Sequence, residues 1–527
     1  MASRRDELNA YTFAKRRTVA AFLRPSATGT EEDAPRPLRT VLPGLVAGAL
    51  LVSGAGVWGL FSPQAPKGWD TPGAMVIVGK RSTTRYVVLS TDVDGTARTR
   101  LHPVLNLASA RLLLDPRHST EVSRIDDGLL DAGKPPRGPV IGIPYAPDRL
   151  PAERDAAKAK RWAVCQRSGG DGRGVRTAAF VLADREAGLL DGAHRTTGGQ
   201  VLYVRSTGGA GERYLVDPAG TKYRLPDGRP DSGTLTTALV GTGATPQPVT
   251  EEWLATLAPG DDLGFPQLPG TVGATAGAPG LGADGNRVGM VLSARTGSGT
   301  QHYVVLPDRV AGVSEFVARL LIAAPATGPL GMRGRAREVD VQALRTGPGV
   351  PAFKDDVRWP RTQGTPVNSV GTGPGSAPAG ERRDTVCSVL RSVDDRGEPT
   401  LSTWAGPGFP VDITAGGTGA YVTPGTGLLY TQVRGRPDGA GGALFLVTDT
   451  GLRYAVPADG GAGRPGAGVP GPQAPGGSGD GRYEPGQAQV RLGYGGIVPV
   501  PVPAAWSEFL SKGPRLDTDS ARQPQGS

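Results

Sequence analysis

The sequence predicts an α+β protein with one N-terminal transmembrane helix, followed by an exported region of four small β-hairpin and helix repeats around a central mixed β domain. Three observations support this prediction. An uncharged apolar stretch follows a basic arm, a strand–glycine turn–strand pattern recurs along the chain, and Gly and Pro make up about a quarter of the 527 residues. A chain of this length also exceeds what a single hydrophobic core accommodates, so several domains are expected.

The predicted transmembrane helix occupies residues 40–61. No charged residue occurs in 40–66, and the apolar positions 41–61 are numerous enough to cross a hydrocarbon core of roughly 30 Å. The arm 1–39 carries the basic residues Arg4, Arg5, Lys15, Arg16, Arg17, Arg24, Arg36 and Arg39. Because positive charge is retained on the inner side of a membrane, the arm is expected in the cytoplasm and the chain from residue 62 onward outside it.

A cleaved signal peptide is the alternative to the membrane anchor. It is disfavoured because the arm is long and the apolar stretch is longer than a usual signal core. The pair Arg4–Arg5 suggests a twin-arginine signal, but it lies far from the apolar run.

One face of the predicted transmembrane helix would carry the small residues Gly44, Gly48, Ala55 and Gly59. Such a face permits close helix packing in lipid, or it reflects only the high Gly content of the chain.

The arm itself is expected to form a basic helix over residues 6–23 with scattered apolar positions. Such a helix lies on the anionic inner leaflet or docks on a partner. The alternative is a solvated helix that only enforces the topology.

Internal repeats provide the clearest signal in the exported region. Residues 213–223 align with 444–454, so that Gly220 matches Gly451 and Tyr223 matches Tyr454. This pattern predicts a hairpin. Downstream, Trp253 and Leu257 match Trp506 and Leu510 at identical spacing. A Trp followed by a Leu four residues later predicts one face of a short helix packed on the sheet, so these residues are expected in the core.

Two weaker copies of the unit begin with residues 85–89 and 302–306, which lead to apolar helical segments at 108–114 and 317–321. The predicted organisation is therefore a cytoplasmic arm (1–39), an anchor (40–61), a linker (62–73), repeat 1 (74–114), the first segment of the central domain (115–200), repeat 2 (201–268), repeat 3 (286–325), the second segment of the central domain (350–427), repeat 4 (428–517) and a disordered tail (518–527). A Gly/Pro-rich stretch at 458–481 is expected to be a mobile loop inside repeat 4.

The only two cysteines, Cys165 and Cys387, fall in the two stretches outside the repeats. In an exported region they are expected to form a disulfide, with two buried free thiols as the alternative. A disulfide would join both stretches into one central domain, with repeats 2 and 3 inserted between them.

No catalytic, metal or cofactor site is predicted. The four histidines lack metal-ligand spacing, and the nearest approach to a phosphate-binding loop, from Gly73 to Gly79-Lys80, has the wrong spacing. A Gly-x-Gly-x-x-Gly match at 461–466 contains Pro465 inside the Gly/Pro-rich stretch. Basic residues are dispersed among acidic ones without aromatic interleaving, which argues against nucleic-acid binding.

The order of these features resembles the EccB family, a membrane subunit of the actinobacterial type VII (ESX) secretion system. The resemblance rests on the arm 9–17, the single anchor, the four repeats, the segments 143–147 and 162–165, and Cys387. It implies an elongated, propeller-like exported body, inner-membrane localisation and self-association. It further implies a structural role beside an EccC-type FtsK-like ATPase, an EccD-type channel subunit and an EccE-type subunit.

The family is sometimes labelled an ATPase, but this sequence lacks a recognisable nucleotide motif. The sequence therefore favours a non-catalytic scaffold for protein export. The alternative is an extracytoplasmic ATPase, nucleotidase or cell-wall-acting enzyme.

Overall fold

The structure is a computed structural model of the 527-residue chain. It describes residues 4–23, 38–61, 65–93, 96–118, 121–169, 174–297, 299–344, 352–368, 383–413, 419–434, 442–458 and 483–525. These residues divide into two compact units. The first comprises Met1–Lys67 with Ile125–Ala132, and the second Gly68–Arg124 with Gly133–Ser527.

The first unit is helical, and its main elements are α1 (Arg4–Leu23), α2 (Leu38–Phe61) and α4 (Asp127–Leu130). Helix α2 covers the predicted anchor and contains Pro43. No helix within the described residues is long and apolar enough to cross a membrane. Gly44 and Gly48 have open space around them, whereas the side chains of residues 54–61, including the predicted packing positions Ala55 and Gly59, lie outside the described residues.

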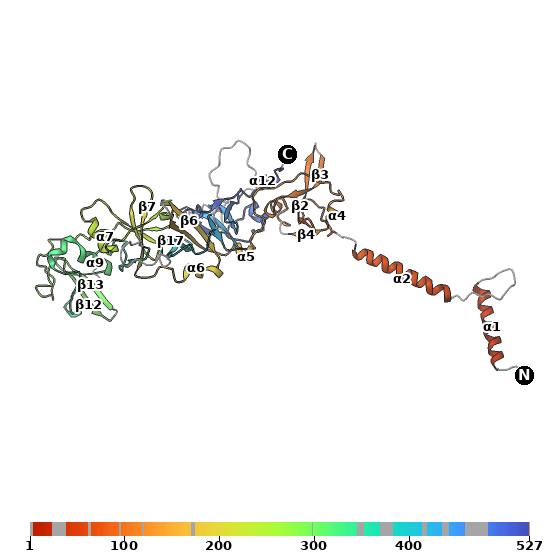
Figure 1. The fold of residues 1–527 in the computed structure, drawn as a ribbon, viewed down its shortest axis with the longest axis horizontal. Coiled ribbons are helices and arrows are strands. Elements are labelled where there is room, and N and C mark those ends of the chain that lie inside the picture. Colours follow the sequence, from red (N-terminus) through yellow and green to blue (C-terminus); the bar gives the residue numbers. More distant parts are fainter. Residues whose placement is uncertain are drawn as a thin grey trace. The chain divides into compact units, whose positions relative to one another are not determined.

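The described residues of the second unit form five sheets, and the central one has the strand order β18-β17-β5-β6-β19. Strands β6 and β17 of this sheet are labelled in Figure 1. Its strands are β5 (Arg161–Ser168), β6 (Val175–Leu182), β17 (Thr385–Val393), β18 (Pro399–Gly406) and β19 (Ala420–Val422). The sheet therefore combines both predicted segments of the central domain. β5 and β17, which are far apart in sequence, pair directly as antiparallel neighbours.

Repeats 2 and 4 share one topology. In each, a three-stranded meander is followed by a helix, then a strand parallel to the first strand, a four-residue helix, and a strand parallel to the third. Repeat 2 contains β7 (Gln200–Ser206), β8 (Arg213–Val216), β9 (Thr221–Leu225), α7 (Ser232–Val240), β10 (Gln247–Val249), α8 (Glu251–Leu254) and β11 (Ala258–Pro259). Repeat 4 contains β20 (Gly427–Val433), β21 (Ala443–Thr448), β22 (Leu452–Ala455), α10 (Gln487–Arg491), β23 (Val500–Pro503), α11 (Ala504–Ser507) and β24 (Ser511–Lys512).

The hairpin turns of these two repeats contain the aligned glycines. Gly220 (φ 78°) and Gly451 (φ 76°) both adopt left-handed backbone, which glycine allows without a Cβ clash. The aligned residues Tyr223 and Tyr454 are buried and pair across the hairpin with Leu215 and Leu446. The matching register explains why the sequence similarity is strongest in this segment.

Repeats 1 and 3 are smaller versions, with four strands each in the orders β3-β2-β1-β4 and β14-β13-β12-β15. Repeat 1 contains β1 (Val76–Gly79), β2 (Arg85–Val93), β3 (Thr96–Val104), α3 (Leu107–Leu113) and β4 (Val122–Ile125). Repeat 3 contains β12 (Val291–Thr296), β13 (Gly299–Val305), β14 (Val310–Val313), α9 (Glu315–Ala323) and β15 (Arg337–Glu338).

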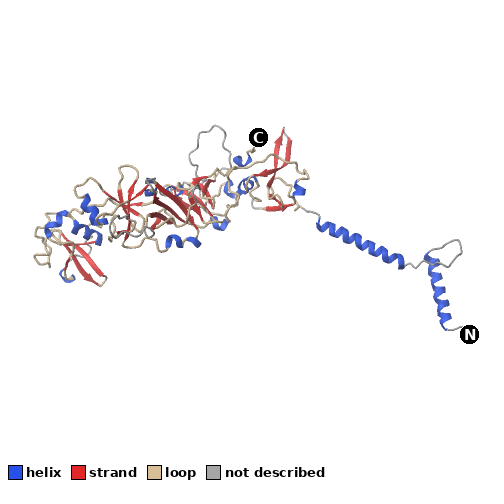
Figure 2. Ribbon diagram, in the orientation of Figure 1, coloured by secondary structure: helices blue, strands red, loops and turns tan. Residues whose placement is uncertain are grey.

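Short elements complete the second unit (Figure 2). They are α5 (Glu153–Ala156), η2 (Asp184–Glu186), α6 (Gly188–Asp191), η3 (Pro325–Leu330), η4 (Val341–Ala343), β16 (Thr365–Pro366) and α12 (Thr518–Arg522).

The hydrophobic cores show how the repeats follow one another within the second unit. One core is shared by repeats 1 and 4, and another by repeat 4, the central sheet and repeat 2. A third core joins repeat 2 to α9 of repeat 3. The chain therefore runs outward from the central domain through repeats 2 and 3 and returns before it forms repeat 4.

The five sheets of the described residues are separate, and no closure into a propeller is found among them. Two expectations from the sequence are wrong. The helix after each hairpin of repeats 2 and 4 is α7 or α10, whereas Trp253 and Trp506 lie on later four-residue helices that end before Leu257 and Leu510. Residues 518–525 of the tail are not disordered, because α12 forms there and Ala521 is fully buried. Residues 459–481 of the predicted Gly/Pro-rich loop (458–481) lie outside the described residues.

The burial of Trp506 predicts a stability effect. The side chain is 1% exposed, so Trp506→Ala leaves a cavity and is expected to lower the free energy of unfolding by about 3–5 kcal/mol. The same change at Val498, which is 70% exposed in the same repeat, should be nearly silent. Thermal denaturation of the full chain in detergent measures both. An unchanged melting temperature for Trp506→Ala, together with lost complex formation, would instead identify Trp506 as a binding residue.

Candidate functional site

The central sheet is the candidate functional site because both Trp-bearing repeats dock on it. Its strands alternate, so that Ala163 and Cys165 face one side while Trp162 and Val164 face the other. Each face is covered by a different hydrophobic core. A sheet covered on both faces is a rigid platform rather than an open cleft.

The disulfide between Cys165 and Cys387 crosses the junction of β5 and β17. The two residues are direct register partners, and both are fully buried. Trp404 is the register partner of Cys387 on β18, and its Nε1 donates to the carbonyl oxygen of Leu189 at 3.1 Å. Leu190 belongs to the same core. Both cysteines are bonded, so the structure offers no thiol for chemistry.

The opposite face receives Trp253 from repeat 2. Its side chain is fully buried, and Nε1 donates to the carbonyl oxygen of Val164 at 2.9 Å. Gln166 exchanges two hydrogen bonds with Thr250, the residue that caps helix α8. Helix α8 and its counterpart α11 in repeat 4 each carry a Trp, and we call them the Trp helices. The Trp helix α8 is therefore fixed to the central strand β5 as well as to its own repeat. The repeat pattern alone could not reveal the contact with β5.

Trp506 of repeat 4 belongs to the same buried core, where Trp162 of the central sheet meets Tyr430 edge-on with ring centroids 5.5 Å apart. The hydroxyl groups of Tyr430 and Ser507 lie 2.7 Å apart. Ser507 follows Trp506 on helix α11, so this hydrogen bond ties α11 to the first strand of its repeat. Repeats 2 and 4 thus both place a Trp helix in the core on one face of the central sheet.

A cation from the third strand of each repeat holds the Trp helix. In repeat 4, Arg453 is buried and donates to Ser507 Oγ at 2.7 Å. In repeat 2, the aligned residue Lys222 donates to the carbonyl oxygen of Leu254 at 2.7 Å, and burial lowers the pKa of Lys222. These cations interact with the ends of the Trp helices and act as structural clamps. Sequence reasoning missed them because neither position belongs to a known motif.

The four histidines lie at separate places among the described residues. His102 is buried, His118 pairs with Glu121, His194 stacks edge-on against Trp404, and His302 lies on β13. No group of three or more His, Cys, Asp or Glu side chains among the described residues is arranged to hold a metal ion.

Of the two nucleotide-like motifs, only the one at 73–80 lies within the described residues. Lys80 follows β1 in an exposed turn, and the glycines at 461–466 lie outside the described residues. A hollow of about 270 Å³, a volume that includes open solvent, lies between repeat 2 and α9 and is lined by residues such as Leu215, Tyr223 and Phe316. The space inside the hollow that a water-sized molecule could occupy is only about 10 Å³, far below the usual volume of small-molecule sites.

Residues 1–526 match the sequence profile of the EccB family, described as type VII secretion system ESX-1, transport TM domain B. The chain belongs to the EccB family. The resemblance found in the sequence is thereby confirmed, and this EccB chain is a component of a type VII secretion system.

Individual curated relatives support the assignment to the EccB family. The ESX-3 secretion system ATPase EccB3 of Mycolicibacterium smegmatis is 29% identical over 451 residues, which cover 80% of this chain and 76% of the relative. The ESX-2 secretion system ATPase EccB2 of Mycobacterium tuberculosis is 32% identical over 335 residues, 62% of this chain and 60% of the relative. The aligned region therefore spans less than two thirds of the second relative.

Solved structures share the fold. An intact ESX-5 inner membrane complex contains a chain with a TM-score of 0.56 and 21% identity, covering 100% of this chain and 96% of that one. An EccB3 dimer from the ESX-3 core complex gives a TM-score of 0.55 and 22% identity, covering 85% and 99%. The mixed α+β architecture with several sheets is therefore the EccB fold.

His102 predicts a pH dependence of stability. Burial lowers its pKa, although Nδ1 lies 3.1 Å from the carbonyl oxygen of Pro139. Gly138 packs so closely on the ring that a Cβ there would lie 2.3 Å from Cε1. A histidine with a lowered folded-state pKa stabilises the fold above its unfolded pKa of about 6.5, and this stabilisation is lost as the pH falls towards the folded value.

The measurement is the melting temperature of the full EccB chain between pH 7.5 and 5. His102→Phe replaces the imidazole by an aromatic ring that cannot be protonated, so its melting temperature should fall less steeply with decreasing pH than that of the wild type. Equal slopes for the wild type and His102→Phe would contradict the assignment.

Proposed function

We propose that this EccB chain is a structural, single-span membrane subunit of the type VII secretion core complex, with its N-terminus in the cytoplasm and its bulk outside the inner membrane. The observation that carries the proposal is the family match over residues 1–526, which includes both the basic arm and the apolar helix. Its role is to scaffold export rather than to catalyse a reaction.

The side chains of α2 support the anchor. Seven large apolar residues on this helix are 52–75% exposed, namely Val41, Leu42, Leu45, Val46, Leu50, Leu51 and Val52. Apolar surface exposed to water is unfavourable by about 25 cal/mol per Å², and a hydrocarbon environment removes that cost. The basic arm before α2 favours a cytoplasmic N-terminus.

The packing of the second unit supports a scaffold. Its large aromatic residues Trp162, Trp253 and Trp506 are buried within the fold, and its two cysteines are bonded to each other. The partners would be an EccC-type FtsK-like ATPase, an EccD-type channel subunit, an EccE-type subunit and a second copy of the chain. The solved relatives come from inner membrane complexes and include an EccB3 dimer.

A second candidate is an extracytoplasmic ATPase or nucleotidase, favoured by the word ATPase in the names of the curated relatives. Helix α2 and the five sheets are compatible with either function. The two candidates differ in whether the isolated chain hydrolyses ATP, because an ATPase must do so when it is separated from the FtsK-like subunit.

Purification of the full chain from its native membranes in a gentle detergent tests the proposal. An FtsK-like ATPase and a multispanning protein should copurify, and ATP hydrolysis should disappear once the FtsK-like subunit is removed. Recovery of a lone monomer would contradict the scaffold role, and hydrolysis that persists in the isolated chain would support the second candidate.

A paired variant tests the small-residue face of α2. Replacing Gly44 and Gly48 by Leu enlarges this face, so copurification of the multispanning partner should fall while the chain stays in the membrane fraction. Ala49→Leu, which points to a different side of the helix, is the control. Equal recovery in both variants would show that the small residues do not form the contact.

A further inference from the structure

Residues 516–525 are built into the second unit. Leu516 and Ala521 are fully buried, and Leu516 N–H donates to the carbonyl oxygen of Ala455 in repeat 4. Asp517 accepts a hydrogen bond from Ser520 N–H and caps helix α12. A polar C-terminal segment with a cap and two buried apolar residues is an ordered element of the fold.

Beyond α12 the segment adds to repeat 1. Gln525 N–H donates to the carbonyl oxygen of Val140 at 2.8 Å, and Gln525 Nε2 donates to that of Gly142 at 2.9 Å. Pro524 forms a bridge with Ile141, whose side chain belongs to the core shared by repeats 1 and 4. Residues 516–525 therefore contact repeat 4 at one end and the 140–142 segment that borders repeat 1 at the other.

A reciprocal arginine contact joins the same two repeats. Arg111 Nη1 on α3 donates to the carbonyl oxygen of Leu492 at 2.9 Å, and Arg491 Nη1 on α10 donates to that of Leu112 at 2.8 Å. Each arginine thus caps the end of the other repeat's helix. Thr518 of α12 donates to the same Leu112 oxygen at 3.3 Å, which places the tail at the centre of this junction.

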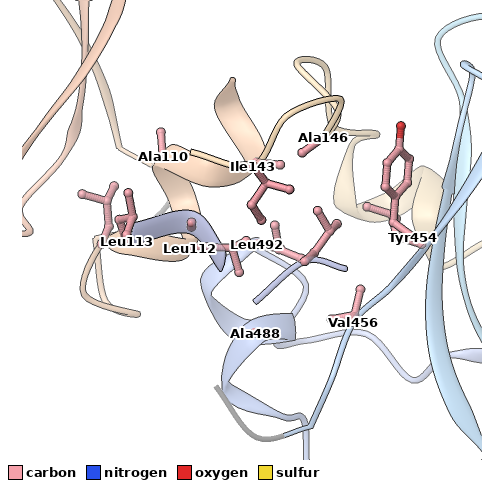
Figure 3. Close-up of a cluster of buried hydrophobic side chains, with 14 of the residues drawn as sticks. Ala110, Leu112, Leu113, Ile143, Ala146, Tyr454, Val456, Ala488 and Leu492 are labelled. Atoms are coloured by element: carbon pink, nitrogen blue, oxygen red, sulfur yellow. The ribbon is translucent and has the colours of Figure 1, made fainter. Parts of the chain in front are cut away.

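Figure 3 shows the apolar side of the junction, where Leu112 and Leu113 of α3 face Ala488 and Leu492 of repeat 4. Ile143 lies between these helices, and Tyr454 and Val456 line the repeat 4 side. The apolar contact and the two arginine bonds join segments that are far apart in the sequence, α3 and α10.

We propose that residues 516–525 are a latch that holds repeat 1 on repeat 4. Release of the latch frees α3, the 140–143 segment and α10, whereas the central sheet and repeats 2 and 3 stay folded. The latch sets how firmly repeat 1 is held on repeat 4. Repeat 1 is also the region of the second unit that lies nearest in sequence to α2. This inference does not depend on the proposed secretion role.

The chain contains a matched control for the arginine contact. Arg319 precedes Leu320 on α9 of repeat 3, as Arg111 precedes Leu112 and Arg491 precedes Leu492. Its side chain is 60% exposed and pairs with Glu315 of the same helix. Arg319→Met therefore removes an arginine from the equivalent helical position without touching the junction.

Hydrogen–deuterium exchange of the full chain in detergent tests the latch. Deletion of residues 517–527 should accelerate amide exchange in α3, 140–143 and α10 by about ten- to a hundredfold, because several buried hydrogen bonds are lost. Exchange in β5, β17, β12 and β13 should stay at the wild-type rate. Arg491→Met, which keeps the tail, should accelerate the same segments to a smaller extent, and Arg319→Met should leave them unchanged.

Two results would overturn the proposal. Wild-type exchange in α3 and 140–143 after the deletion would show that the tail is dispensable. Equal acceleration in β5 and β17 for both the deletion and Arg491→Met would show that the segment supports the whole unit rather than one junction.

Discussion

The pairing of β5 with β17 is the contact on which the second unit of this EccB chain depends. The two strands are separated by the whole of repeats 2 and 3, yet they lie at the centre of one sheet and are joined by the disulfide between Cys165 and Cys387. A link with a sequence separation of 222 restricts the unfolded chain strongly and contributes about 5 kcal/mol in the entropy model. Once β5 and β17 are paired, repeats 2 and 3 form an insertion that begins and ends at the central sheet. Repeats 1 and 4 precede and follow these strands in the sequence.

The repeats use the central sheet in a shared way. Trp253 and Trp506 come from equivalent four-residue helices and enter one core on the same face of the sheet. Lys222 and Arg453, which are aligned in the repeats, each interact with the end of such a helix. Repeats 1 and 3 lack the Trp helix and instead attach through helix pairs to repeats 4 and 2. This division explains why two copies of the repeat are strong in sequence and two are weak.

The sequence predicts those features that depend on a particular residue type, such as glycine in a left-handed turn or cysteine in a disulfide. Gly220 and Gly451 mark left-handed turns, and two cysteines outside the repeats pair across one sheet. Prediction failed where non-local packing decides. The Trp–Leu spacing resembles a helical face, but Leu257 and Leu510 follow the helix and reach the core from a turn. The order of the polar tail is not predicted because its partners, the carbonyl groups of residues 140 and 142, lie far away in the sequence, with Gly142 383 residues from Gln525. Lys222 and Arg453 are aligned basic residues in the repeats, but the sequence does not show which helix ends they and the arginines contact.

The β5–β17 junction stabilises the docking of both Trp helices. Amide exchange of the full chain in detergent, compared between the wild type and the double variant Cys165→Ala/Cys387→Ala, measures this directly. We expect β5, β17, α8 and α11 to lose protection together, whereas β12 and β13 of repeat 3 should exchange at the wild-type rate. Loss of protection in β5 and β17 with α8 and α11 unchanged would contradict it.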